Sequence, residues 1–280
     1  MWNKLIDAKF LVFVPFGYAL HTRIRGLRNL IHNAATAWIP ALILIALASP
    51  NDALSAFWKL PISYICFIAF YELGYLYNDT LGTRGETNPR LRLKHRLAPW
   101  ETAAVIGIRV FTIIAISGLT GWYQQLSWLT FYACLGTVIV LHNTISETAI
   151  RLVTFFQMSL MRFVAPIFIW IPPSKFTMCL LAGAVFFTFT RFITYLEAKG
   201  RLELPERKRW WYFLSVHLAF CPLSALISLA LWDWSFLLLT TYFVVLYGSY
   251  AMFKFKSDSN KPQLEFGIAS SPATPDVTRD

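Results

Sequence analysis

The sequence has 280 residues, of which 56% are hydrophobic and only 14% are charged. A soluble domain of this length carries roughly a quarter charged residues, so this composition excludes an ordinary soluble domain. The long apolar runs predict an all-α, polytopic bundle of transmembrane helices. The net charge of +10 is spread over loops between these runs rather than over one continuous surface, which argues against a nucleic-acid partner.

The N-terminal segment, residues 1–31, contains the apolar stretch Phe10–Leu20, which is interrupted by Pro15. The stretch has 11 residues, too few to cross a bilayer, since a membrane-spanning helix needs about 20. Basic residues flank it on both sides, and no small-residue cleavage site follows it. We therefore expect an interfacial or re-entrant segment in contact with membrane lipid.

The transmembrane bundle is expected over residues 32–253, with about eight spans and room for a ninth. We place the spans at 32–49, 57–77, 103–121, 126–142, 150–171, 176–197, 210–232 and 235–253. Their connections alternate between nearly uncharged loops and loops rich in Lys and Arg. Short basic loops stay in the cytoplasm, so an even number of spans puts both termini there. In a bacterium this membrane would be the inner membrane, and the polar tail, residues 254–280, is expected to be a disordered cytoplasmic segment.

A polar stretch closes the second predicted span. Glu72 comes seven residues before Asp79, so the two acids share a helix face about 10 Å apart. Asn78, Asp79 and Glu86 offer oxygen ligands of the kind that Mg²⁺ prefers, and a basic loop follows them. The stretch is equally compatible with an ordinary helix end and a solvated loop.

The sixth predicted span ends in the same way, with Arg191, Tyr195 and Glu197 followed by Lys199 and Arg201. Two distant spans thus end on the same side with an acid and a basic loop. Acids from both helix ends, meeting across a cavity, would form a pocket for a metal-bound diphosphate. Charges also gather at helix ends for no catalytic reason, so this remains a hypothesis about the site.

Three arginines lie inside predicted spans: Arg109, Arg162 and Arg191. An intramembrane charge is costly unless it pairs with an acid or faces a wet cavity. Glu72 and Glu147 are the available acidic partners, so structural ion pairing is one outcome for all three arginines. Arg162 lies about three turns inside its span and is the strongest candidate for a pocket residue.

In order and spacing these motifs resemble the UbiA superfamily of intramembrane prenyltransferases. That family carries Asn-Asp-x-x-Asp-x-x-x-Asp on its second helix, which "NDTLGTRGE" matches at Asn78, Asp79 and Glu86, with Gly82 replacing the middle acid. "HRLAPWE" resembles the family's Arg-Pro element, although Leu97 follows Arg96. The second acidic motif is reduced to Glu197, and the family usually has about nine helices, so the match is that of a divergent member.

The resemblance implies a bundle with a lateral opening to lipid and a cavity facing the cytoplasm. It implies that Mg²⁺ is held by Asn78, Asp79, Glu86 and Glu197. It implies catalytic roles for Asp79, Arg96 and Arg162. The substrate-binding residues that it implies are Glu72, Arg84, Lys94, Arg96, Arg191, Tyr195, Lys199 and Arg201. Aromatic residues of the second, fifth and sixth spans would line the isoprenoid path: Tyr71, Tyr75, Phe155, Phe156 and Phe187.

The implied function is a Mg²⁺-dependent transfer of a prenyl group from an allylic or polyprenyl diphosphate lipid to an acceptor that the sequence does not identify. Missing acids in both motifs leave two alternatives open. One is a lipid-linked sugar-phosphate transferase of related fold, which needs a similar grip on diphosphate. The other is a non-catalytic membrane transporter or assembly protein. A transporter typically shows an internal repeat and charges near the membrane midplane, neither of which is evident here.

Overall fold

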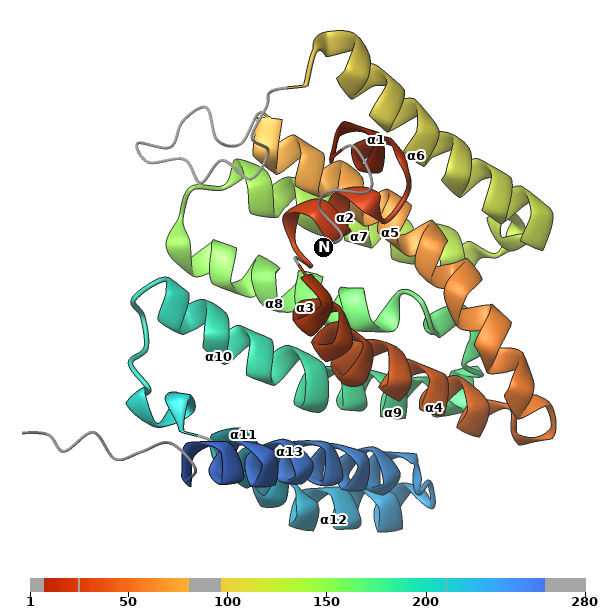
Figure 1. The fold of residues 1–280 in the computed structure, drawn as a ribbon. Coiled ribbons are helices and arrows are strands. Elements are labelled where there is room, and N and C mark those ends of the chain that lie inside the picture. Colours follow the sequence, from red (N-terminus) through yellow and green to blue (C-terminus); the bar gives the residue numbers. More distant parts are fainter. Residues whose placement is uncertain (1–7, 25, 81–96, 210, 260–280) are drawn as a thin grey trace, which may run out of the picture.

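The computed structural model describes residues 8–24, 26–80, 97–209 and 211–259, and every regular element in them is a helix (Figure 1). The α-helices are α1 (Ala8–Phe13), α2 (Gly17–Thr22), α3 (Gly26–Asn33), α4 (Ile39–Ala48), α5 (Ala56–Thr80), α6 (Pro99–Thr120), α7 (Leu126–Thr144), α8 (Thr148–Val164), α9 (Pro173–Ala182), α10 (Phe189–Ala198), α11 (Tyr212–Ala219), α12 (Cys221–Leu231) and α13 (Ser235–Ser259). The all-helical prediction is confirmed for these residues.

Seven stretches of the described chain are long and apolar enough to cross a membrane, which makes this a multi-pass membrane protein. They are Gly26–Ala48, Pro50–Thr80, Pro99–Thr120, Leu126–Thr144, Pro173–Ala198, Tyr212–Leu231 and Ser235–Lys254. Seven of the eight predicted spans therefore have a counterpart. The predicted span at 150–171 corresponds to α8, which has only 17 residues and carries Arg151 and Arg162.

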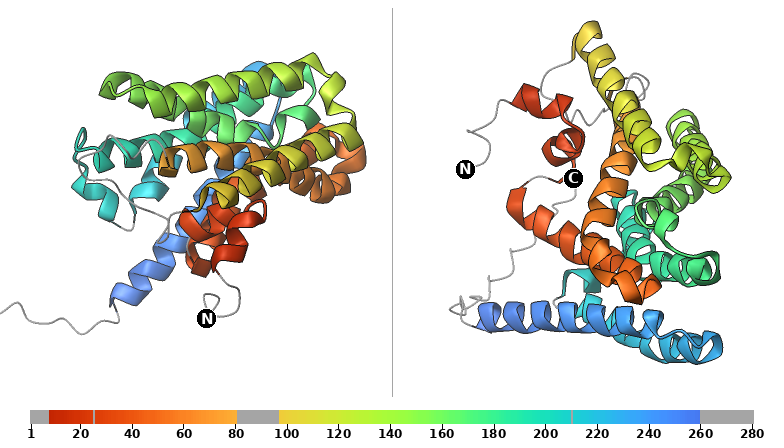
Figure 2. Two further views of the ribbon diagram at one scale, coloured as in Figure 1. Left: turned by 90° about the horizontal axis from the view of Figure 1, so that it is seen from above. Right: turned by 90° about the vertical axis from the view of Figure 1, so that its right-hand side faces the viewer.

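The long helices run back and forth beside one another. Chain neighbours pack as antiparallel pairs, among them α5 with α6, α7 with α8 and α12 with α13. The short connections 121–125 and 165–172 lie at one end of the bundle, and the connections 145–147 and 199–209 lie at the other (Figure 1). Helix α13 crosses the remaining helices obliquely, and the N-terminal helices lie outside the main stack (Figure 2).

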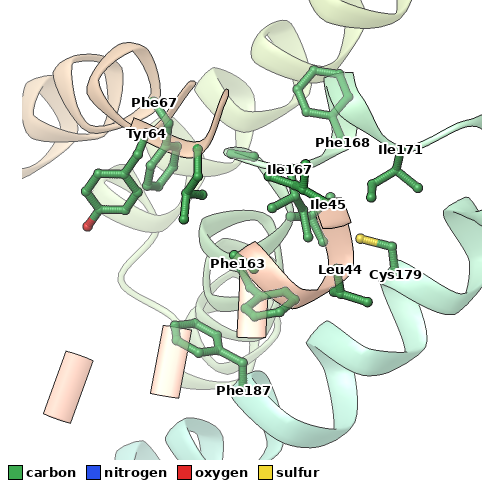
Figure 3. Packing of buried hydrophobic residues seen from close by; sticks show 14 of the residues in the cluster. Leu44, Ile45, Tyr64, Phe67, Phe163, Ile167, Phe168, Ile171, Cys179 and Phe187 are labelled. Atoms are coloured by element: carbon green, nitrogen blue, oxygen red, sulfur yellow. The ribbon is translucent and has the colours of Figure 1, made fainter. Parts of the chain in front are cut away.

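A continuous apolar core joins α4, α5, α8 and α9 (Figure 3). Phe67 of α5 and Ile45 of α4 are almost fully buried in it, and Phe163 packs against Phe187 with ring centroids 5.4 Å apart. The outer surface is also apolar. On α6, Phe111 is 72% exposed and Leu119 is 89% exposed, as expected for side chains that face lipid rather than water.

Two of the spans contain a wide π-helical turn, in which hydrogen bonds skip one more residue than in an α-helix. One is η2 (Ala34–Trp38), between α3 and α4, and the other is η7 (Gly183–Thr188), between α9 and α10. Gly183 lets η7 approach α8 closely, because a Cβ atom there would lie 2.9 Å from Phe163 Cδ1. Such turns occur often at functional sites.

Both ends of the bundle differ from the predicted boundaries. The first apolar span begins with α3 at Gly26 rather than at residue 32, and the segment before it folds into the short helices α1 and α2. Each of these has six residues, so neither crosses a membrane on its own. At the other end, α13 continues to Ser259, past the expected end of the bundle at residue 253. Residues 260–280 of the predicted tail lie outside the described part.

Candidate functional site

The centre of the candidate site is Arg162, whose guanidinium group joins three helices. Its Nη1 atom donates a hydrogen bond to the hydroxyl of Tyr75 on α5 at 3.1 Å. Its Nη2 atom donates to Oδ1 of Asn33 on α3 at 3.3 Å. Both partners are neutral. Arg162 is therefore held in place without a countercharge from another described residue.

Arg191 approaches the same region from α10, just after the π-helical turn η7. Its guanidinium group lies over the ring of Phe187, 4.9 Å from the ring centroid. Its buried Nε atom has no hydrogen-bond partner. Within the described residues neither Arg191 nor Arg162 forms an ion pair with an acid. Two positive charges thus lie inside the bundle without compensation, which is costly unless an anion or water meets them.

A third arginine, Arg23 of the N-terminal segment, joins Arg162, Arg191 and their neighbours in what we call the arginine cluster. Arg23 follows α2, and its Nη2 atom lies 3.2 and 3.1 Å from the two carboxylate oxygens of Asp79. Tyr18 donates a hydrogen bond to the same carboxylate at 2.8 Å, and the Asn78 side chain bonds to it at 3.1 Å. The Arg23 guanidinium group also covers the ring of Tyr75 at 4.3 Å. Asp79 is therefore part of an ion pair, and its arginine stacks on the tyrosine that holds Arg162.

The cluster contains buried hydrogen-bond donors without acceptors. They are Nε and Nη1 of Arg23 and Nε of Arg191, whereas the side chains of Asn33 and Trp38 meet the hydroxyl of Tyr64, which can accept from them. Buried polar groups in proteins are nearly always hydrogen-bonded. These arginine N–H groups can only donate. Their natural partner is an acceptor-rich, negatively charged group.

A cavity of about 350 Å³ opens beside Arg191, within the size range of small-ligand sites. Its polar lining residues are His32, Thr36, Thr190, Arg191, Thr194 and Tyr195. Its aromatic lining residues are Phe155, Phe186, Phe187, Phe213 and Tyr247. A narrow gap lined by Asn33, Trp38, Tyr64 and Arg162 shares Phe187 with this cavity. A lining that combines polar groups with aromatic rings suits a ligand with an anionic head and an apolar body.

Glu72, one of the predicted substrate-binding residues, lies in a separate cluster at the turn between α1 and α2. It pairs with Arg109 at 2.9 Å, and both side chains are fully enclosed. Its carboxylate also accepts the backbone N–H groups of Phe16 and Ala19. Arg109 donates to the carbonyls of Val12, Phe13 and Val14. Of the two roles that the sequence left open for Arg109, the structure bears out ion pairing.

Glu197 and the residues after it form a third group at the end of α10. Glu197 forms an ion pair with Arg207, which also donates a hydrogen bond to Thr194 at 2.9 Å. Tyr195 stacks on Phe155 with ring centroids 3.8 Å apart, and it lines the cavity as expected for a substrate-binding residue. Lys199 lies 5.8 Å from the Tyr195 ring centroid, and Arg201 is exposed.

The described part of the predicted magnesium site does not form a metal-binding group. No set of three His, Cys, Asp or Glu residues in the described chain is arranged to hold an ion. Asp79 and Glu197 are instead each paired with an arginine of their own. Glu86 and the basic residues Arg84, Lys94 and Arg96 lie outside the described residues, so those predictions stay untested.

Several residues of the cluster were not candidates from the sequence, namely Arg23, His32, Asn33 and Tyr64. Arg23 and His32 lie in or next to the N-terminal segment, which the sequence marked only as basic and apolar. Asn33 offered a weak signal, because an amide at the start of an apolar span must find a partner. Nothing in the local sequence indicates that it would meet Arg162 of α8.

Comparisons with known proteins do not identify a family. No protein-family model matches the sequence, and neither curated proteins nor solved structures give a match.

Proposed function

We propose that this protein is an integral-membrane transferase that acts on an allylic or polyprenyl diphosphate. The observation that carries the proposal is the pair of arginines, Arg162 and Arg191, which have no acidic partner among the described residues and lie beside a cavity lined in part by aromatic rings. Guanidinium groups bind phosphate oxygens through paired, charge-assisted hydrogen bonds. The aromatic rings offer an apolar surface of the kind that an isoprenoid chain would occupy.

The orientation that we propose has eight spans, with α8 crossing the membrane and both termini in the cytoplasm. Support comes from the arrangement of the connections. The loop at 199–209, which is rich in Lys and Arg, lies at the same end of the bundle as the connection 145–147 (Figure 1). The opposite connections, 121–125 and 165–172, contain no charged residue. Basic loops stay in the cytoplasm, so the basic end would face inward.

The proposed reaction breaks the bond between the allylic carbon and the diphosphate oxygen. The electron pair leaves with the diphosphate, whose added negative charge Arg162 and Arg191 would stabilise. The allylic carbon becomes electrophilic and forms a new bond to a nucleophilic atom of the acceptor, which loses its proton to water. Aromatic rings of the cavity wall, such as Phe187 and Tyr195, would stabilise the positive charge on the carbon by cation–π attraction.

Magnesium stays a prediction from the family resemblance. Among the described residues Asn78, Asp79 and Glu197 remain as its candidate ligands; the carboxylate of Asp79 already meets Arg23 and Tyr18, and that of Glu197 meets Arg207. No step of the proposed reaction is assigned to the metal.

Transfer of a radiolabelled prenyl group tests the proposal. Purified protein in lipid nanodiscs is incubated with labelled farnesyl diphosphate and with a membrane extract as the source of acceptor. Label should move into a new product with the wild-type protein and fall by at least about tenfold with Arg162→Gln or Arg191→Gln, because each removes a charge-assisted contact.

The matched control is Lys175→Gln. Lys175 is also a basic residue of a span, but it bonds to the carbonyl of Leu47 and pairs with Asp233, away from the cluster. The transfer activity of the Lys175→Gln variant should equal that of the wild type. If no diphosphate of any prenyl length binds to the purified protein or yields a product, the proposal is wrong. Transfer that is equally strong in both arginine variants would show that the cluster is not the site.

A further inference from the structure

We infer that the site binds the diphosphate group without a metal ion, because its own arginines supply the positive charge. The inference rests on the proposed function and concerns how the same site holds its substrate. A family-type site gathers carboxylates and needs Mg²⁺ to bridge them to a diphosphate of the same sign. The cluster described here has the opposite sign, so it can meet the diphosphate directly.

The charge balance of the cluster is positive. Arg23 and Asp79 form one pair, so their charges cancel. Arg162 and Arg191 have no acid against them among the described residues, and they approach from neighbouring helices. Adding a dianion would neutralise this excess. Adding a divalent cation alone would increase it, which an apolar interior disfavours.

The hydrogen-bonding balance points in the same direction. The unpaired buried N–H groups of Arg23 and Arg191 are donors only. Metal ligands must present lone pairs, and these groups have none to offer. Phosphate oxygens accept several hydrogen bonds each and match the surplus of donors.

The cavity gives the anion a place next to Arg191. The polar residues Thr190, Arg191 and Thr194 line the space of about 350 Å³. Arg162 lies in the narrow gap that shares Phe187 with the cavity. The diphosphate would therefore contact Arg191 directly and would be attracted by Arg162 at slightly longer range.

The test measures binding rather than turnover. Full-length protein in nanodiscs of uncharged phosphatidylcholine is titrated with inorganic pyrophosphate by isothermal calorimetry, once with EDTA and once with excess Mg²⁺. We expect comparable affinity in the two conditions. Arg191→Gln and Arg162→Gln should weaken metal-free binding by on the order of tenfold or more, whereas Lys175→Gln should not change it. Arg191→Lys, which keeps the charge, should bind better than Arg191→Gln and shows that the site is still folded.

Asp79→Asn separates the two kinds of site. A metal ligand would be required for binding, so the substitution would weaken it. In the arginine site the negative charge of Asp79 pairs with Arg23 and repels the bound anion, so metal-free pyrophosphate binding should stay equal or become tighter.

The outcomes are distinguishable from those of the proposed function. Binding that occurs only with Mg²⁺, or that is lost in Asp79→Asn, overturns the metal-free site and leaves the transferase in place. If neither pyrophosphate nor farnesyl diphosphate binds with or without Mg²⁺, the proposed function fails as well. Binding that Lys175→Gln weakens as much as Arg191→Gln would reflect only the overall positive charge and would also overturn the inference.

Discussion

Arg109 of α6 and Glu72 of α5 form an ion pair at 2.9 Å in which neither side chain reaches the surface. Together they satisfy five backbone groups at the turn between α1 and α2, since Glu72 accepts two N–H groups and Arg109 donates to three carbonyls. Backbone groups at an irregular turn would otherwise lack partners in an apolar environment. The pair therefore fixes the N-terminal segment, and with it Arg23, against the bundle.

Removing one member of this pair should unfold the segment or the protein. We expect Arg109→Met to cost about 3–5 kcal/mol of unfolding free energy, because it leaves a buried, unpaired carboxylate. The measurement is thermal unfolding in nanodiscs, combined with limited proteolysis after Arg23. Glu72→Gln combined with Arg109→Met should be more stable than Arg109→Met alone, because the unpaired charge is gone. Equal stability of the two variants would contradict a structural role for the pair.

Close packing of α5 on α7 depends on Gly74. A Cβ atom at this position would lie 2.6 Å from Cγ2 of Ile139, so Gly74→Ala should lower stability by about 1–3 kcal/mol. Ile139→Ala in the same chain should recover part of the loss, which a double-mutant cycle on unfolding measures. Gly107→Ala is the control, because no atom lies within 4 Å of its Cβ position. Additive effects of the two substitutions would rule out the contact.

The cavity beside Arg191 should decide how well the isoprenoid part binds. Ala198→Trp places an indole in this space, and we expect farnesyl diphosphate to bind on the order of tenfold more weakly, since about two buried CH₂ groups account for that loss. The affinity for inorganic pyrophosphate, which has no isoprenoid part, should fall less. Titration of both ligands checks the difference, with Leu226→Trp on the exposed face of α12 as the control. An equal loss for both ligands would place the isoprenoid elsewhere.

Accessibility of single cysteines tests whether α8 crosses the membrane. The four native cysteines are replaced by alanine, and one cysteine is introduced at a time at Ser146 before α8 or at Ser174 after it. A membrane-impermeant maleimide should label Ser146→Cys from the cytoplasmic side only and Ser174→Cys from the opposite side only. As independent markers, Glu203→Cys should be labelled from the cytoplasmic side and Gln124→Cys from the opposite side. Labelling of Ser146→Cys and Ser174→Cys from one side would show that α8 does not span.

The membrane-helical fold could be predicted because apolar length and loop charge are local properties of a sequence. That Arg162 lies inside the bundle could also be anticipated, since it falls about three turns inside its predicted span. The acid that pairs with each arginine could not be predicted, because this depends on which helices pack against one another. Glu72 was both a candidate for substrate binding and a candidate partner for an intramembrane arginine, and only the packing of α5 on α6 separates these roles.

The part played by the N-terminal segment was the least predictable. Helix α2 of this segment carries Tyr18, and Arg23 follows its last residue. Both side chains bond to Asp79, which lies more than 50 residues further along the chain. A motif read along α5 alone assigns Asp79 to a metal, because the arginine that faces it lies on another element. The sequence resemblance drew attention to Asp79 and Glu197 as metal ligands and did not indicate that each would pair with an arginine.

The π-helical turn η7 has a geometric consequence for Arg191. An α-helix advances about 100° per residue, and a π-helical turn accommodates one residue more than an α-helical turn. If Gly183–Thr188 kept all its residues but wound as a regular α-helix, Arg191 would swing by about 100° around the axis of α10, relative to lining residues on other helices such as Phe155 of α8. The direction in which the Arg191 side chain faces therefore depends on the π-helical turn that precedes it as well as on the residue type.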